Sequence, residues 1–293
     1  MAPHEQPKPR NNARKAAARA LQKQNPGMSY MQALRKVTET DIGAEASTPL
    51  HIRSLLNISS AEDIAARHRD ATRNMTVPVG ISASGDTATL NIAHAAVHPE
   101  GVGPHGAITG PGALDSALTL ALALRANNGA ERVQVAFAGP EGQCRTAAPA
   151  VDQVVATPWH EWLRAELTRR LEIAHAAQVT NVYDLEDVPS LVVLLAADGG
   201  HVTPAEEVAA MAHAVRTGRS LGVHVILISP DPIIWRRHSA VTGNLTFHVT
   251  LGDGSGRHVA SADTFDAGQF TFSPAQLGGG ELAGWITTVR QAS

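Results

Sequence analysis

The runs Leu191-Val-Val-Leu-Leu195 and Val223-His-Val-Ile-Leu-Ile228 decide the fold class of this chain. Nearly every position in both runs is apolar, whereas a strand with one face in water alternates apolar and polar residues. Such runs are typical of strands in the middle of a parallel sheet, where helices cover both faces. The sequence therefore predicts an α/β fold, with helices on both sides of a mainly parallel sheet.

Strand and helix patterns alternate around these two runs, as βαβ units require. Upstream, Val77-Pro-Val-Gly-Ile-Ser82, a turn at Ser84-Gly85-Asp86 and the stretch from Thr87 to Ile92 predict a β-hairpin, preceded by a helix near 60–71. The expected strands are 105–109, 132–138, 190–197, 223–229, 245–251 and 269–273, and the expected helices are 114–127, 158–178, 204–219 and one from about Glu281.

Composition indicates a folded chain without a membrane span. Of the 293 residues 43% are hydrophobic, yet no apolar stretch approaches the ~18 residues of a membrane helix, and the first thirty residues are too polar for a signal peptide. The single cysteine, Cys144, excludes an intramolecular disulfide and is interpreted as a small buried side chain. We therefore expect a cytoplasmic protein with no transmembrane segment.

The N-terminal part is basic and the remainder is acidic. Residues 1–36 contain eight basic side chains and one acid, Glu5, whereas the remainder contains 16 basic and 26 acidic residues. Two short helices, over 12–24 and 29–36, are predicted to form a hairpin. Its basic residues favour contact with nucleic acid, an anionic membrane surface or an acidic protein face, although a solvated tail explains them almost equally well. Those that we consider for binding are Arg14, Lys15, Arg19 and Lys23.

Three parts are expected along the chain. They are a basic helical arm over 1–40, a linker with short helices over 41–76, and one large domain over 77–293. Among the 14 histidines, His94, His98 and His105 lie closest together, but they lack an Asp or Cys at ligand spacing, so no metal site is predicted.

Four segments resemble one family in both order and spacing. They are Val77-Pro-Val-Gly80, Gly103-Pro-His-Gly-Ala-Ile-Thr-Gly110, Pro189-Ser-Leu-Val-Val-Leu-Leu195 and Gly218-Arg-Ser-Leu-Gly-Val-His-Val-Ile-Leu227. The chain resembles the FtsK/SpoIIIE-type motor ATPases, and among them the type VII secretion motor EccC, over roughly residues 50–275. The resemblance implies a RecA-like P-loop NTPase fold. In that family these segments are the hairpin before the motor, the strand into the Walker A loop, the Walker B strand and a strand with a polar sensor.

The Walker A chemistry of that family is missing. Its pattern, Gly-x4-Gly-Lys-Ser/Thr, wraps phosphates with backbone N–H groups, neutralises them with the lysine and holds Mg²⁺ with the hydroxyl. Counted from Gly110, Asp115 takes the second glycine position, Ser116 the lysine position and Ala117 the hydroxyl position. A one-residue deletion places Asp115 at the lysine and Ser116 at the hydroxyl. No lysine occurs after Lys36, so no alignment restores the cation.

The other catalytic positions are also altered. The Walker B strand of the family ends in Asp-Glu, which this chain replaces by Ala196-Ala197, and Asp198 follows as a loop residue. The sensor position carries Ser229-Pro230-Asp231, and Phe247-His248 stands where the family has an arginine. The degenerate nucleotide pocket is thus predicted to consist of Gly110, Gly112, Asp115, Ser116, Ala196, Ala197 and Asp198. No catalytic residue is assigned, and binding of ATP and Mg²⁺ is disfavoured.

Three functions fit these observations. The first is a catalytically inactive, EccC-like protein-binding module, whose partner is a secretion substrate or a motor ATPase. The second is a DNA-binding accessory protein that contacts nucleic acid through residues 1–36. The third is an inactive subunit or regulator of a partner ring ATPase, with oligomerisation and with Arg216, Arg219, Arg236 and Arg237 as interface residues.

Overall fold

A computed structural model describes residues 51–69, 72–82, 84–94, 98, 100–156, 158–197, 204–231, 238–252, 260–264, 268–277 and 280–292, together with 19, 20, 22, 23, 25, 29 and 30. The chain divides into two compact units, Met1–Thr48 and Pro49–Ser293. In the first unit Arg19, Ala20, Gln22, Lys23 and Tyr30 are helical, and most of the predicted helical hairpin lies outside the described residues.

The second unit is built on one ten-stranded sheet. Its strand order is β2-β1-β10-β9-β8-β3-β7-β6-β4-β5, and the six strands from β8 to β5 are parallel. The strands are β1 (Thr76–Ser82), β2 (Thr87–Asn91), β3 (Gly106–Thr109), β4 (Val133–Ala138), β5 (Gln153–Val155), β6 (Ser190–Ala196), β7 (Val223–Ser229), β8 (Phe247–Thr250), β9 (Ala260–Thr264) and β10 (Gly268–Pro274).

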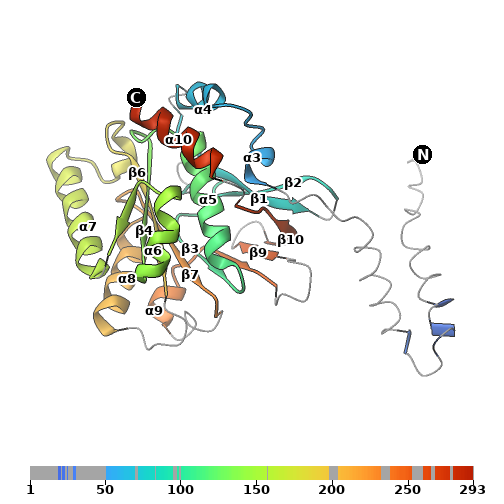
Figure 1. The fold of residues 1–293 in the computed structure, drawn as a ribbon. Helices are drawn as coiled ribbons and strands as arrows, with labels where there is room; N and C mark the ends of the chain where they lie inside the picture. Colours follow the sequence, from blue (N-terminus) through green and yellow to red (C-terminus); the bar gives the residue numbers. More distant parts are fainter. Residues whose placement is uncertain are drawn as a thin grey trace, which may run out of the picture. The chain divides into compact units, whose positions relative to one another are not determined.

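Helices cover both faces of this sheet, so the predicted α/β class with a mainly parallel sheet is confirmed (Figure 1). One face packs against α5 and α10, and the other packs against α7 and α8. The helices are α3 (Ile52–Leu55), α4 (Ala61–His68), α5 (Ala113–Asn127), α6 (Glu141–Ala147), α7 (Trp159–Ala176), α8 (Ala205–Thr217), α9 (Ser239–Thr242) and α10 (Glu281–Ala292), with short 3₁₀ turns at Ala148–Ala150 and Val182–Asp184.

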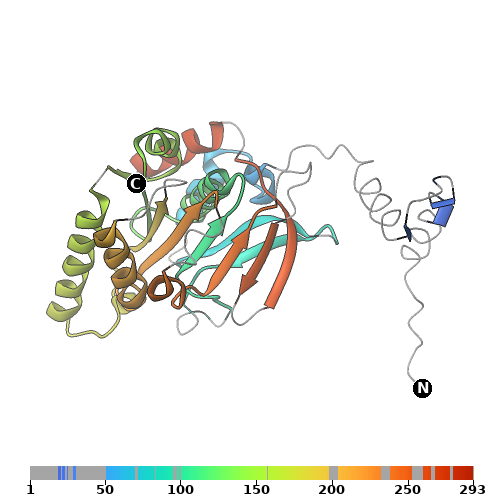
Figure 2. The same ribbon diagram turned by 90° about the horizontal axis from the view of Figure 1, so that it is seen from below.

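The predicted hairpin is part of the sheet and does not stand before it. Strand β1 pairs with β2 on one side and with β10 on the other, both antiparallel, so that the first and last strands of the unit lie side by side (Figure 2). Gly80 makes this pairing possible, because a Cβ there would lie 2.0 Å from the carbonyl oxygen of Ser273. The chain also enters the unit at this side, where the Ile52 N–H donates to the carbonyl of Gln276 at 3.1 Å.

The central helix α5 is apolar around most of its circumference. From Ala117 to Asn127 all of its residues are buried, as expected for a helix enclosed by the sheet and by the helices α4 and α10. Its last turn is fixed by Arg125, whose Nε donates to Asp152 Oδ1 at 2.9 Å, and Arg290 of α10 donates to the same oxygen at 2.6 Å. Asp152 therefore joins α5 and α10, and it also accepts the N–H of Val135 in β4 at 2.8 Å.

Two buried histidines lie near the amino ends of β3 and β7. His224 is fully buried, with Nδ1 3.1 Å from the carbonyl of Ile92 and Nε2 3.0 Å from the hydroxyl of Tyr183. These partners suit a neutral ring that donates from Nδ1 and accepts at Nε2. The Nδ1 of His105 accepts the Val225 N–H at 3.1 Å. Burial lowers the pKa of both rings to about 3.

The single cysteine and one tryptophan of the described chain are buried. Cys144 is buried, as predicted, with its thiol 3.2 Å from the carbonyl of Gly139. Trp159 is buried at the start of α7. Among the described residues, no helix is both long and apolar enough to cross a membrane.

Acid should destabilise this fold through the two histidines. Below about pH 6.5 the unfolded rings bind protons that the folded rings with a pKa near 3 do not, so stability is lost as the pH falls from 6.5 towards 3. Each histidine contributes up to about 1.4 kcal/mol per pH unit in that window. Thermal unfolding between pH 7 and 4 should show a shallower loss for His224→Gln than for the wild type. His213→Gln, at an exposed position, is the control, and equal slopes for all three proteins would contradict this account.

Candidate functional site

The carboxyl ends of the parallel strands form the edge at which a P-loop fold places its chemistry. In the sheet register Thr109 of β3 lies beside Ser229 of β7 and Thr250 of β8. On the other side of β7, Ala196 of β6 lies beside Ile228. The positions that the sequence assigned to Walker A, Walker B and sensor elements therefore end at one edge of the sheet.

The connection from β3 to α5 is a tight turn of three residues, Gly110, Pro111 and Gly112. The carbonyl of Gly110 accepts the N–H of Ala113 at 3.1 Å, and Gly112 has φ 78° and ψ 12°. Proline at the second position, glycine with positive φ at the third and this hydrogen bond are the features of a type II β-turn. A β-turn thus occupies the place of a phosphate-binding loop.

Most of the N–H groups of this turn are bound within the protein. The Gly110 N–H donates to the carbonyl of Ser229 at 3.0 Å, the Ala113 N–H closes the turn, and Pro111 has no N–H. Gly112 alone among the four turn residues has an N–H outside these bonds. A Walker A loop holds phosphate with several successive N–H groups, and this turn does not present such a series.

Asp115 and Ser116 lie in the first turn of α5, within the helix predicted over 114–127. The helix begins at Ala113, so these residues follow its start by two and three positions, and Ala117 is already fully buried. Asp115 is exposed, and its carboxylate is at the end of the helix where the macrodipole favours negative charge. The first turn of α5 therefore carries an acid that suits the helix terminus.

Leu251 closes the turn from the side of β8. Its N–H donates to the carbonyl of Thr109 at 2.7 Å, and a Cβ at Gly110 would lie only 2.4 Å from the Leu251 carbonyl oxygen. Gly110 also has φ 104°, a conformation that favours glycine. The backbone after β8 thus packs directly on the turn.

The edge at β6 carries no acid among the described residues. Ala196 is half-buried in the core beside α5, and Ala197 packs against the core on the other face while its N–H donates to the Ile228 carbonyl at 3.0 Å. At the end of β7 the hydroxyl of Ser229 accepts the N–H of Asp231 at 3.1 Å. Asp198, the remaining member of the predicted pocket, lies outside the described residues.

The nearest arginines in the sequence are held at the opposite end of the domain. Arg125 is at the last turn of α5, about 18 Å along the helix axis from Ala113, where it binds Asp152 and the Pro149 carbonyl. Arg132 precedes β4, at the amino edge of the sheet. Neither arginine replaces the missing lysine.

A groove of about 320 Å³ lies beside the turn. Among the described residues that line it, Asp115 is the one charged side chain, and the other polar side chains are Ser116 and Gln276. The remaining walls are apolar. The lining residues are Pro111, Gly112, Asp115, Ser116, Leu251, Pro274, Ala275, Gln276 and Leu277.

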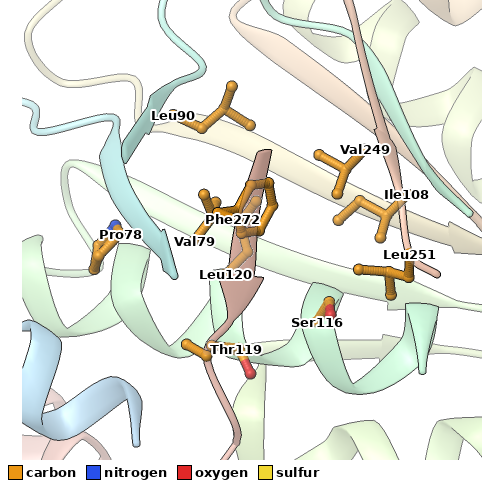
Figure 3. A pocket seen from close by; sticks show the side chains of 11 residues that line it. Pro78, Val79, Leu90, Ile108, Ser116, Thr119, Leu120, Val249, Leu251 and Phe272 are labelled. Atoms are coloured by element: carbon orange, nitrogen blue, oxygen red, sulfur yellow. The ribbon is translucent and has the colours of Figure 1, made fainter. Parts of the chain in front are cut away.

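A small apolar cavity continues from this groove into the core, because Ser116, Leu251 and Ala275 line both. Figure 3 shows side chains that line it, among them Ser116 and Leu120 of α5, Phe272 of β10 and Leu251 beyond β8. The enclosed space is about 20 Å³, which holds one water-sized or methyl-sized group. The Thr119 hydroxyl is bound to the Asp115 carbonyl at 2.8 Å, so the cavity surface is mainly apolar.

The structure brings together part of the predicted pocket. Gly110 and Gly112 lie in the turn, and Asp115 and Ser116 lie in the first turn of the helix that follows it. Ala196 and Ala197 lie at the end of β6, which is separated from β3 by β7. Of the residues predicted to bind a partner or nucleic acid, Arg14 and Lys15 lie outside the described part, and Arg19 and Lys23 are helical in the N-terminal unit. No group of three potential metal ligands occurs among the described residues.

Sequence reasoning missed the β10 side of the site. Pro274, Ala275, Gln276 and Leu277 line the groove, but they lie more than 150 residues after Gly110 and belong to no motif. The one available signal was the alternating stretch Gln269-Phe-Thr-Phe272, which indicated a strand without indicating its neighbours.

Solved structures supply the comparison. The cytoplasmic domain of the Thermomonospora curvata type VII secretion ATPase EccC superposes with a TM-score of 0.67 at 20% sequence identity, over 84% of this chain and 35% of that one. The chain has the fold of these ATPase domains. EssC (ATPases 2 and 3) from Geobacillus thermodenitrificans has a TM-score of 0.56 at 12% identity, over 75% of this chain and 50% of that one.

A conjugation coupling protein has the same fold. The pCW3 conjugation coupling protein TcpA, solved with ATPγS, matches with a TM-score of 0.55 at 12% identity, over 76% of this chain and 72% of that one. The resemblance to FtsK/SpoIIIE-type ATPases and the RecA-like P-loop fold are thereby confirmed at the level of fold. This chain spans about a third to a half of the EccC and EssC structures that it matches. No family profile and no curated protein sequence matches it.

Alanine substitution should cost different amounts of stability at the two glycines of the turn. Gly110→Ala should destabilise the fold by about 2 kcal/mol or more, since the added Cβ meets the Leu251 carbonyl and φ is positive. Gly112→Ala should cost about 1 kcal/mol, because its Cβ would enter open space and only the backbone conformation is strained. Urea unfolding measures both.

Gly142→Ala in α6 is the matched control for these variants, because its Cβ meets nothing within 4 Å and alanine suits a helix. It should be neutral or stabilising. If Gly110→Ala unfolds at the same urea concentration as Gly142→Ala, the turn is not packed as described.

Proposed function

We propose that this chain is a non-hydrolysing, EccC-like P-loop module that binds a protein partner. The observation that carries the proposal is the type II turn from Gly110 to Ala113, whose hydrogen bonds occupy the place of a phosphate-binding loop. ATP and Mg²⁺ are not cofactors in this proposal. The alternatives, DNA binding through residues 1–36 and service as an inactive subunit of a ring, stay predictions from the sequence.

The missing groups argue against useful hydrolysis. Phosphoryl transfer depends on a fixed cation, a magnesium ligand and a residue that orients the attacking water. Here the lysine position is occupied by Ser116 or, with a one-residue deletion, by Asp115, and Ala196-Ala197 replaces the Asp-Glu pair at the end of the Walker B strand. Loss of one stabilising group typically costs about 10²–10³ in rate, so the combined loss leaves no functional turnover.

A related domain supports a protein partner. Thermomonospora curvata EccC (ATPases 2 and 3) was solved in complex with a signal sequence peptide, and it matches this chain with a TM-score of 0.50 at 13% identity, over 85% of this chain and 48% of that one. In this chain the groove beside the turn has mainly apolar walls, which suit a peptide better than a triphosphate. We therefore propose a secretion substrate or a neighbouring motor domain as the partner.

The chain should neither bind nor hydrolyse ATP. Calorimetric titration with Mg-ATPγS should give no saturable heat, and phosphate release should equal that of a buffer blank. Ser116→Lys should not restore binding, because the N–H groups of the short turn remain bound to Ser229 and Gly110. Saturable binding to the wild type, or turnover by protein freed of contaminating ATPases, would refute the proposal.

Protein binding has a separate test. Fluorescently labelled signal-sequence peptides of type VII secretion substrates should show a rise in anisotropy when the chain is added. Purified motor domains of a type VII secretion ATPase should bind the immobilised full chain. Both affinities should be micromolar. The same peptides in scrambled order are the control. Failure of every peptide and every motor domain to bind above the scrambled control would count against a protein-binding module.

A further inference from the structure

The groove beside the turn combines an apolar floor with a negative rim. Leu251, Ala275 and Leu277 supply apolar surface, and Asp115 supplies the charge among the described lining residues. Ala275 and Leu251 are buried at 7% and 5% exposure, so they form a fixed floor, whereas Asp115 is exposed. A ligand here meets an apolar surface beneath and a carboxylate at the edge.

The cavity behind the floor gives the groove depth. It is enclosed by side chains of β1, β2, β3, β8, β10 and α5, and Ser116 and Ala275 stand at the border between groove and cavity. Of the three residues that line both spaces, Ser116 and Ala275 are small and Leu251 is the third. An aliphatic side chain that lies in the groove can place its terminal methyl group in the cavity without displacing backbone.

The charge at the rim selects a cation. The N-terminus of a helix carries about half a positive charge, which the full negative charge of Asp115 outweighs. With no lysine or arginine among the described lining residues, the rim is electronegative and repels phosphate and carboxylate groups. Lysine and arginine side chains complement it.

We propose that this groove binds a segment of the partner protein in which an aliphatic side chain is followed or preceded within one helical turn by lysine or arginine. The aliphatic side chain enters between Ser116 and Ala275, and the cation pairs with Asp115. This inference rests on the proposed function and adds to it the chemistry of the partner.

The test is selection from a random 12-residue peptide library on the immobilised full chain. Enriched peptides are synthesised with a fluorescent label and titrated by anisotropy. They should contain Leu, Ile, Val or Met within four positions of Lys or Arg. Ser116→Leu, which fills the border between groove and cavity, should weaken their binding more than tenfold.

Asp115→Asn should weaken the same peptides by up to about fivefold, as expected for an exposed ion pair, and this effect should shrink in 0.5 M salt. Glu161→Gln is the matched control, because Glu161 is also an exposed acid in the first turn of a helix, α7, on the other face of the sheet. Leu277→Ser removes an apolar wall of the groove at a half-buried position. It tests peptide binding to the groove if Ser116→Leu does not fold.

The inference is overturned if the selected peptides bind Asp115→Asn as tightly as the wild type and also bind Ser116→Leu or Leu277→Ser as tightly as the wild type. It is also overturned if acidic peptides dominate the selection, or if Mg-ATP displaces the selected peptides. Peptides that bind elsewhere, with no ATP hydrolysis, would refute the groove and leave the proposed function standing. Turnover of ATP would refute the proposed function itself.

Discussion

The hydrogen bond from the Gly110 N–H to the Ser229 carbonyl, 3.0 Å long, fixes how the first strand of the parallel sheet enters its helix. It holds the start of the turn on β7, the strand next to β3, and the positive φ of Gly110 directs the chain away at once. Pro111 and Gly112 then leave room for only one β-turn before α5 begins. The helix start, the exposure of Asp115 and the position of Leu251 against the turn all follow from this constraint.

The turn also explains why the fold can persist without a nucleotide. In a P-loop the backbone N–H groups point at a ligand and depend on it for partners, since an unpaired buried N–H is costly. Here Ser229 and Gly110 provide those partners within the chain, and Asp115 complements the helix terminus that phosphate would otherwise occupy. The backbone groups of the turn and the start of α5 are thus satisfied within the chain.

The parallel class of the sheet could be predicted because its central strands, buried on both faces, are continuous apolar runs. Val223–Ser229 is buried at every position and was predicted at the same bounds. By contrast, β5 spans three residues, too few to show a period, and β9 contains Ser261 and Asp263, which did not suggest a strand. The hairpin was predicted correctly, yet its pairing with β10 depends on contacts nearly 200 residues apart, which no local pattern records. The pairing of strands far apart in the sequence could therefore not be predicted.

For the site, the helix predicted over 114–127 already included Asp115 and Ser116, and the structure starts that helix one residue earlier, at Ala113. Pro111-Gly112 carried the information that was needed, because proline and glycine in this order are the central pair of a type II turn and imply a helix that starts directly afterwards. Because α5 starts at Ala113, the spacer after the first glycine of the Walker A pattern runs into the helix in either alignment. The groove itself required β10, so its apolar floor could not be inferred from the motif. The motif residues alone indicate which chemistry the sequence lacks, whereas the elements around them, here β10 and the segment after β8, determine what the groove can bind.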